Sequence, residues 1–291
     1  MKKTLDLWAL KHLALCLDIS EDELITVSEN TKKYYFSWKK PKKDGTFREI
    51  SDTAPRLKII QKKLHQLLKK VVLSDAAHGG VPGRTNQSNA DAHCGESFIY
   101  KLDFRSYFPS ISHQRVFHLF RHELNCSNDV ASLLTKLTTI NGCVPQGSST
   151  SMDIANLVCR NLDAWLIGLS KSFGLKYTRY VDDLTFSGKH IPERFKKKLK
   201  KIIKLKQWLY LNDSKESLNG KNQEQIVTGL NIKYKKPKIT RAYKRSVKKE
   251  KHILSKLSAN ELNDTELENS KSSVKGKENY ILHIEGAGTN G

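Results

Sequence analysis

YTRYVDDLTFS, residues 177–187, places two adjacent aspartates between two short runs of aromatic and apolar residues. The runs YTRY and LTFSG have the aromatic and β-branched content of strands, so they predict a hairpin with Val181, Asp182 and Asp183 at its turn. Adjacent carboxylates repel each other, and each raises the other's pKa. Because aspartate is also a common turn residue, the pair alone predicts only a turn.

A third carboxylate ends another predicted strand. FIYKLD (98–103) is a buried-type run that ends at Asp103, 79 residues before Asp182. If both strands belong to one sheet, the aspartates converge, and clustered carboxylates are ligands for hard cations such as Mg²⁺. Two ions about 3.5–4 Å apart can activate an attacking hydroxyl and stabilise a leaving oxygen. We expect two Mg²⁺ ions, with Mn²⁺ as a substitute, held mainly by Asp103 and Asp182, with Asp183 in a supporting role.

The charge of the chain indicates a polyanionic partner. The formal net charge is +21, and residues 189–256 contain 22 Lys and Arg against five Asp and Glu. In KKYYFSWKKPKK (32–43), aromatic residues alternate with lysines. Such a concentrated excess favours nucleic acid over an anionic membrane, because each neutralised phosphate releases counterions. A solvated basic surface remains the alternative.

Other bulk features exclude several classes of protein. No run of about 18 apolar residues predicts a transmembrane helix, so we expect no membrane partner. The opening MKKTLDLWALKHLALCLDISEDE (1–23) is interpreted as an amphipathic helix and not as a signal peptide. Five scattered cysteines form no CxxC pair, which predicts no disulfide framework or zinc site and indicates a reducing cytoplasm.

Periodicity and turn signals predict the order of the elements. Helices and strands do not alternate steadily, which favours an α+β fold with an antiparallel sheet over a doubly wound parallel one. The final turn EGAGTNG (285–291) should fray. We expect helices over about 56–71, 112–124 (capped by Ser112), 128–140 (capped by Asn128), 151–172, 193–207 and 241–257, and strands over 98–103, 177–180, 184–188 and 225–232.

Together these stretches resemble the motifs of reverse transcriptases. YVDD matches the YxDD motif C, LDFRSYFPSI (102–111) resembles motif A, and GCVPQGSSTSMDIANL (142–157) resembles motif B, in the same order. FREISDTAPRLKIIQKKL (47–64) resembles the first fingers motif, and YLNDSKESL (210–218) resembles motif D. Met152 stands where the family more often has proline, which should shift a helix start. The resemblance covers roughly residues 46–232.

Two further stretches resemble the retron type within this family. NADAH (89–93) fits its NAxxH signature, and IVTGL (226–230) contains its VTG triplet. VKGKENYILHI (274–284) resembles its late thumb segment more weakly. A group II intron, diversity-generating or abortive-infection enzyme remains an alternative, although intron enzymes usually carry a longer region after the palm. A non-catalytic RNA-binding palm is disfavoured, because all three aspartates are intact.

The resemblance implies a right-hand polymerase fold with fingers, an antiparallel-sheet palm and a short helical thumb. We expect the N-terminal helix and fingers at 1–100, the palm at 101–235 with fingers helices inserted at about 112–140, and a basic thumb at 236–291.

Roles for individual residues are also implied by the resemblance. Asp103, Asp182 and Asp183 would be catalytic and hold the metal ions. Phe108 would exclude a 2′-OH, with Tyr107 as the off-by-one alternative. Arg48, Phe108, Gln146, Gly147 and Lys215 would bind the nucleotide, and Asn89, His93, Tyr180, Thr228, Gly229, Lys244 and Arg245 would meet primer, template or RNA.

The implied activity is that of an RNA-directed DNA polymerase. It would use dNTPs to copy part of a structured noncoding RNA, priming from an internal 2′-OH, into a branched RNA-linked single-stranded DNA (msDNA). The family implies cytoplasmic action in anti-phage defence, together with a separate effector protein. The basic helices after residue 189 would grip duplex phosphates.

Overall fold

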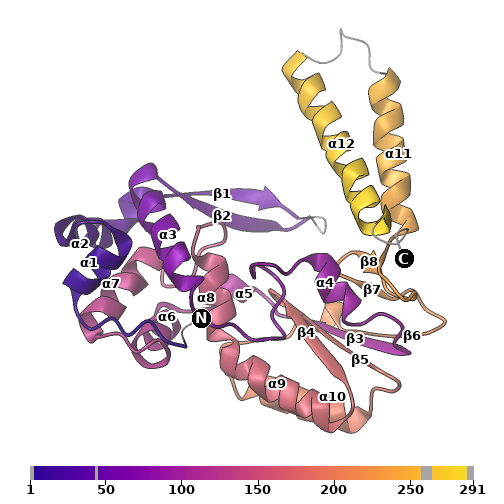
Figure 1. Cartoon of the computed structure of the whole chain (residues 1–291), viewed down its shortest axis with the longest axis horizontal. Helices are drawn as coiled ribbons and strands as arrows, with labels where there is room; N and C mark the ends of the chain where they lie inside the picture. The colour runs from indigo at the N-terminus through magenta and orange to yellow at the C-terminus, as the bar shows by residue number, and fades with distance from the viewer. Residues whose placement is uncertain (1–2, 43–44, 257–263, 287–291) are drawn as a thin grey trace.

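A four-stranded antiparallel sheet, here called the palm sheet, positions the predicted carboxylates (Figure 1). The computed structural model describes residues 3–42, 45–256 and 264–286. The antiparallel pairing confirms the expected α+β class. The strands run in the order β4 (Lys176–Tyr180), β5 (Asp183–Gly188), β3 (Phe98–Asp103) and β6 (Ser217–Gly220).

The turn between β4 and β5 is shorter than predicted. Tyr180 pairs with Asp183, so only Val181 and Asp182 connect the strands, and Asp183 begins β5. Asp183 also lies directly opposite Asp103 of β3. Residues opposite each other in an antiparallel pair share one face of the sheet, so these two carboxylates point to the same side.

The two faces of the palm sheet are covered differently. Because side chains alternate along a strand, Leu184 and Phe186 lie on the face opposite Asp183. There Phe186 packs on Phe195, with ring centroids 5.2 Å apart. Figure 1 shows the two helices of this layer, α9 (Arg160–Ser172) and α10 (Glu193–Lys204), beneath the sheet. On the other face, the end that carries Asp183 is exposed, whereas His93 covers the far end by bonding Ser187.

The predicted helices are largely present, with three differences. The N-terminal helix is two helices, because Asp18 adopts φ 50° and ends α1 before Ser20 caps α2. Ser127, and not Asn128, caps α7. The expected helix 151–172 is interrupted at Cys159. Besides α9 and α10, the α-helices of the described residues are α1 (Leu10–Leu17), α2 (Glu21–Glu29), α3 (Pro55–Leu68), α4 (Asn86–Asp91), α5 (Tyr107–Ser110), α6 (His113–His118), α7 (Asn128–Thr138), α8 (Ser151–Val158), α11 (Arg241–Lys256) and α12 (Asp264–Gly286).

A β-hairpin that the sequence did not predict extends over the palm sheet (Figure 1). Its strands are β1 (Tyr35–Pro41) and β2 (Phe47–Thr53). It is tied to the motif B loop, where the backbone N–H of Ser51 donates to the carbonyl of Gln146 at 2.7 Å. This bond links the fingers to the palm.

The expected single strand over 225–232 is wrong. The segment forms two short antiparallel strands, β7 (Ile226–Val227) and β8 (Leu230–Asn231), which continue to β9 (Lys238–Ile239). The reason is the turn: Thr228 and Gly229 have φ of 44° and 82°, the left-handed pair that a tight hairpin requires.

A second, smaller core holds the C-terminal helices. The main core spans fingers and palm, whereas the second joins α4, β3, the β7–β9 sheet and α12. Figure 1 shows α11 and α12 side by side, projecting from this point. Within the described residues, no helix has the length and apolarity needed to cross a membrane. Residues 287–291 of the predicted frayed turn lie outside the described residues, as does Leu257 of the predicted basic helix. The second core consists of Ala90, Ile99, Val227, Leu230, Ile232, Ile239 and Ile284.

Candidate active site

Three carboxylates meet where β3, β5 and the β4–β5 turn come together. One ligand oxygen from each of Asp103, Asp182 and Asp183 lies within 4.8 Å of the others. Asp103 is buried, Asp182 is half-buried and Asp183 is exposed. The expected convergence is thus present, and Asp183, opposite Asp103, is as close to the cluster as Asp182.

The cluster has the electrostatics of a cation site. Burial and the charge of Asp103 raise the pKa of Asp182, and Arg48 and Lys215 partly offset the rise. Burial, the charge of Asp182 and a hydrogen bond to Asp103 raise the pKa of Asp183 to about 7. The Nζ of Lys215 donates to Oδ2 of Asp103 at 2.8 Å, a bond that raises the lysine pKa. One lysine cannot neutralise three carboxylates, so the donor set fits divalent metal.

The turn that carries Asp182 is held in a strained conformation. Val181 has φ 60°, a region that β-branched residues rarely adopt. Gly79 packs directly on this turn, because a Cβ added there would lie 2.8 Å from the Val181 nitrogen. A glycine is therefore required beside the turn.

A fully buried polar network supports the same turn. The Arg179 guanidinium donates to both Asp163 carboxylate oxygens, at 2.9 and 2.7 Å, and to the Val181 carbonyl at 3.0 Å. It also donates to Asn156 Oδ1 at 3.0 Å, and Asn156 donates to the Gly79 carbonyl at 2.8 Å. Sequence reasoning missed this network, although a charged residue at the core-facing position of YTRY was a signal.

Of the predicted nucleotide-binding residues, Lys215 bonds Asp103, and the charge of Arg48 acts to lower the pKa of Asp182. Arg48 is exposed on β2, and Gln146 is half-buried in the motif B loop. Gly147 has φ 121°, and an added Cβ would lie 2.9 Å from the Ser51 carbonyl oxygen. Gly147 thus permits the close approach of β2. The close backbone approach that we expected at this glycine is made to the backbone of Ser51.

Of the two aromatic candidates after Asp103, only Phe108 has free surface. Tyr107 is fully buried, and its hydroxyl donates to the Ala155 carbonyl at 2.6 Å. Phe108 is half-buried and packs against the Tyr107 ring, with centroids 5.6 Å apart. The geometry therefore favours Phe108 for contact with a sugar.

Asn89 and His93 lie inside the protein. Asn89 is 1% exposed and His93 is fully buried. The two ring nitrogens of His93 bond the hydroxyls of Ser187 and Thr178, each at 2.7 Å, and burial lowers the His93 pKa to about 3. The neutral ring joins α4 to β4 and β5. This arrangement leaves no surface for direct RNA contact, so of the two expected roles it favours holding the loop.

The two retron signatures meet in space, because Ala90 of NADAH and Val227 of the VTG triplet lie in the same small core. The Thr228 hydroxyl donates to the Asn86 carbonyl at 2.8 Å, and the Asn86 amide bonds the Tyr280 hydroxyl of α12. Thr228 therefore helps to fix α4 and the C-terminal helices, while Gly229 lies exposed at the tip of its turn.

The other candidate RNA contacts lie on β4 and on α11. Tyr180 is half-buried at the end of β4. Lys244 forms an ion pair with Glu285 of α12 at 2.7 Å, whereas Arg245 is exposed. Arg245 is therefore the more accessible of the two for a phosphate.

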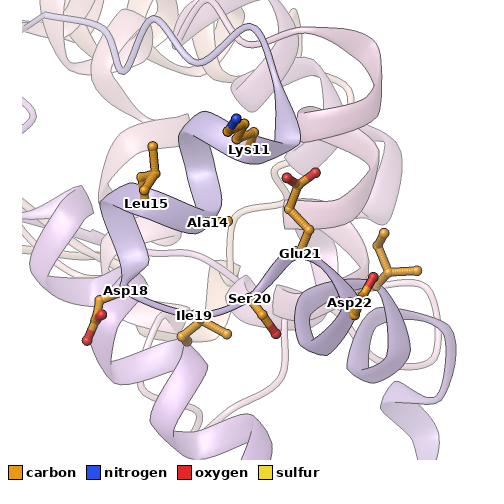
Figure 2. A pocket seen from close by; sticks show the side chains of 9 residues that line it. Lys11, Ala14, Leu15, Asp18, Ile19, Ser20, Glu21 and Asp22 are labelled. Atoms are coloured by element: carbon orange, nitrogen blue, oxygen red, sulfur yellow. The ribbon is translucent and has the colours of Figure 1, made fainter.

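A hollow of about 720 Å³ lies between α1 and α2, on the fingers. Figure 2 shows Lys11 and Leu15 of α1 and Glu21 and Asp22 of α2 around it. It contains none of the candidate site residues.

An antiparallel sheet that presents three clustered carboxylates, with a basic hairpin above it, defines a metal-dependent nucleotidyltransferase of the polymerase type. The profile of the family described as reverse transcriptase (RNA-dependent DNA polymerase) matches residues 40–240. The chain therefore belongs to the reverse transcriptase family and is of the retron type. It is an RNA-directed DNA polymerase, and the family implies a divalent metal and an RNA template.

The relatives support the retron type. The chain is 33% identical over 260 residues to the retron Se72 reverse transcriptase of Salmonella heidelberg (strain 579083-10), covering 87% of this chain and 68% of that protein. It is 32% identical to the retron Ec86 enzyme of Escherichia coli, covering 70% and 64%. The retron Mx162 enzyme of Myxococcus xanthus is 37% identical, covering 54% and 36%.

Among solved structures, the apo telomerase of Candida tropicalis truncated from its C-terminal domain aligns with a TM-score of 0.46 and 12% identity, covering 76% of this chain and 61% of that one. The family assignment rests on the sequence matches.

The metal-free carboxylate cluster should destabilise the fold. The Asp183 pKa is raised to about 7, so the folded state loses stability as the pH rises from about 4 through 7. Asp183→Asn should therefore raise the stability in EDTA at pH 8 by about 1 kcal/mol, after discounting for solvent screening of this exposed group, and the gain should vanish towards pH 4.

Thermal melts in EDTA test this expectation, and melts in Mg²⁺ serve as the control. Mg²⁺ should raise the melting temperature of the wild type more than that of the variant, because the cation relieves the repulsion. A variant that melts below the wild type in EDTA at pH 8 would contradict the interpretation.

Proposed function

We propose that this enzyme copies part of a structured noncoding RNA into a branched, RNA-linked single-stranded DNA. The observation that carries the proposal is the packing of NADAH against the VTG turn, through Ala90 and Val227, in a chain that keeps all three clustered carboxylates. The likeness to retron enzymes supports the same substrate class. We also propose fingers at 1–100, a palm at 101–235 and a thumb at 236–291, acting in the cytoplasm in anti-phage defence with a separate effector.

In this proposal Asp103, Asp182 and Asp183 hold two Mg²⁺ ions, with Mn²⁺ able to substitute. When bound, such ions supply activation of the attacking hydroxyl and neutralisation of charge at the phosphate. Lys215, at 2.8 Å from Asp103, is positioned to turn towards the triphosphate once a metal neutralises that carboxylate. Lys215 is the proposed donor to the pyrophosphate oxygens.

The other proposed roles follow from position. Arg48 would clamp the triphosphate of the dNTP from the fingers hairpin with its planar guanidinium. Gln146 would contact the nucleotide from the motif B loop, whose shape depends on Gly147. Tyr180, beside Asp183 in the hairpin, would support the primer end.

The function is tested with RNA transcribed from the DNA beside the gene. When this RNA is incubated with the purified protein, labelled dNTPs and Mg²⁺, the labelled DNA should stay joined to RNA after denaturation, and ribonuclease should shorten the joined product. Labelled DNA separable from all RNA would contradict the branched product. In cells, phage plating should fall when the gene is expressed with its neighbours, and unchanged plating would contradict the defence role.

Phe108 is expected to select deoxyribonucleotides. Phe108→Val removes ring surface where a 2′-OH would lie, so ribonucleotide incorporation should rise roughly 10- to 100-fold relative to dNTP incorporation. Primer extension with each nucleotide measures the ratio. Tyr107→Phe is the matched control, because it changes a buried aromatic that cannot reach the sugar; an equal change in that variant would contradict the assignment.

A further inference from the structure

The basic helix α10 faces away from the active site. Its apolar residues Phe195, Leu199 and Ile203 are buried, and Phe195 packs on Phe186 from the sheet face opposite Asp183. Figure 1 shows α9 and α10 on the far side of the sheet from the β1–β2 hairpin and from α11 and α12. A duplex that reaches the carboxylates therefore cannot touch the outer face of α10, contrary to the expectation that all basic helices grip it.

That outer face carries an uncompensated row of charge. Arg194, Lys197, Lys201 and Lys204 are all exposed and lie three or four residues apart. In the described part of the chain, no ion pair involves these four side chains, whereas the flanking Lys196 and Lys200 pair with acidic residues. Like charges at this spacing destabilise a helix by about 0.2–0.5 kcal/mol per pair. The row is thus a feature that folding alone does not favour.

An exposed aromatic side chain lies beside the residues that follow the carboxyl end of α10. Trp165 of α9 is 51% exposed. The Nζ of Lys206 lies 4.0 Å from the centre of its ring. An exposed indole beside ammonium groups offers both a stacking surface for an unpaired base and a charge for its phosphate. A lipid surface also favours an interfacial Trp, but the apolar face that α10 would insert into lipid is already buried against the palm sheet.

We propose that Lys197, Lys201, Lys204 and Trp165 form a second RNA site on the back of the palm, which binds an unpaired stretch of RNA outside the catalytic cleft. The inference rests on the proposed function only in taking RNA as the partner. An enzyme that copies part of one RNA must stay bound to that RNA during synthesis. A binding site outside the catalytic centre is not disturbed when the primer end moves.

The test compares two variants with equal loss of charge. K197Q/K201Q/K204Q removes the row, and K11Q/K62Q/K70Q neutralises three exposed lysines of the N-terminal region. Binding of a fluorescein-labelled single-stranded RNA of mixed sequence is measured by anisotropy against salt, with the active site saturated by a short, fully paired RNA–DNA duplex that offers no unpaired RNA to the second site. The α10 variant should reduce the slope of log K against log salt by about 2, which corresponds to three lost phosphate contacts.

Trp165→Leu should weaken binding of the same RNA roughly 5- to 100-fold and leave the salt slope unchanged, because stacking releases no counterions. The proposal is overturned if the α10 variant binds like the wild type, if the K11Q/K62Q/K70Q control loses as much, or if Trp165→Leu has no effect. It is also overturned if vesicles containing phosphatidylglycerol displace the RNA and bind more tightly than it does.

DNA synthesis on oligo(dT)-primed poly(rA) with dTTP distinguishes failure of the second RNA site from failure of the proposed polymerase function. All these variants should extend it at the wild-type rate, since none lies near the carboxylates. Loss of extension in the α10 variant alone would place α10 in the catalytic path and overturn a separate site. Absence of extension by the wild type would contradict polymerase activity and would leave the binding results to decide the second site.

Discussion

Replacing Asp182 and Asp183 together by asparagine should lower DNA synthesis at least about 10³-fold, because cation-assisted charge stabilisation supplies several kcal/mol in such sites. The two carboxylates and Asp103 offer the three clustered oxygens, and amides bind hard cations far more weakly. Primer extension on poly(rA) with dTTP measures the loss. RNA binding should stay unchanged, because the basic surfaces remain.

The matched control is Glu21→Gln with Asp22→Asn, an adjacent acidic pair at the start of α2 on the fingers. It changes the net charge by the same amount at a place far from the palm sheet. If synthesis persists in the Asp182/Asp183 variant, these residues are not catalytic. If the control loses as much synthesis, the loss is caused by the change in net charge and not by the site.

Arg179→Met should destabilise the protein by about 3–5 kcal/mol, because it leaves the buried Asp163 carboxylate without its positive partner, with only the Tyr177 hydroxyl still donating to it at 2.8 Å. Both side chains of the ion pair are fully buried. Adding Asp163→Leu should recover part of the stability, since it removes the unpaired charge but also the acceptor of the Tyr177 hydroxyl. Urea unfolding of the single and double variants measures both changes.

The same pair of variants tests whether Arg179 positions the metal-binding turn. The double variant still lacks the bond to the Val181 carbonyl, so it should remain slow in primer extension and need more Mg²⁺ for half-maximal rate. A double variant that is both stable and fully active at wild-type Mg²⁺ concentrations would show that the network only fills the core.

The site could be predicted from sequence where short motifs fix both residue type and backbone. Asp103 at a strand end and Asp182 in a tight turn are of this kind, and they converge as expected. The position of Asp183 was less clear, because the turn holds two residues and not three, which places Asp183 in register with Asp103. A one-residue difference in a turn cannot be read from composition.

The missed features are those in which tertiary contacts override local pattern. In the β1–β2 hairpin, β1 is exposed along nearly all of its length, so this strand lacks the alternation of buried and exposed residues that would indicate it. Arg179 and Asp163 are about as buried as any residue in the core, a placement that depends on their pairing across two elements. The structural role of His93 likewise depends on two hydroxyl partners from β4 and β5, which lie far from it in the sequence.

Sequencing the nucleic acid that copurifies with the protein shows whether this enzyme makes a branched RNA–DNA product. We expect one abundant structured RNA joined to a single-stranded DNA whose sequence is complementary to part of that RNA. The Asp182→Asn, Asp183→Asn variant should carry the same RNA without the DNA. Copurified RNA of mixed cellular origin, or the same DNA bound to the variant, would contradict the account.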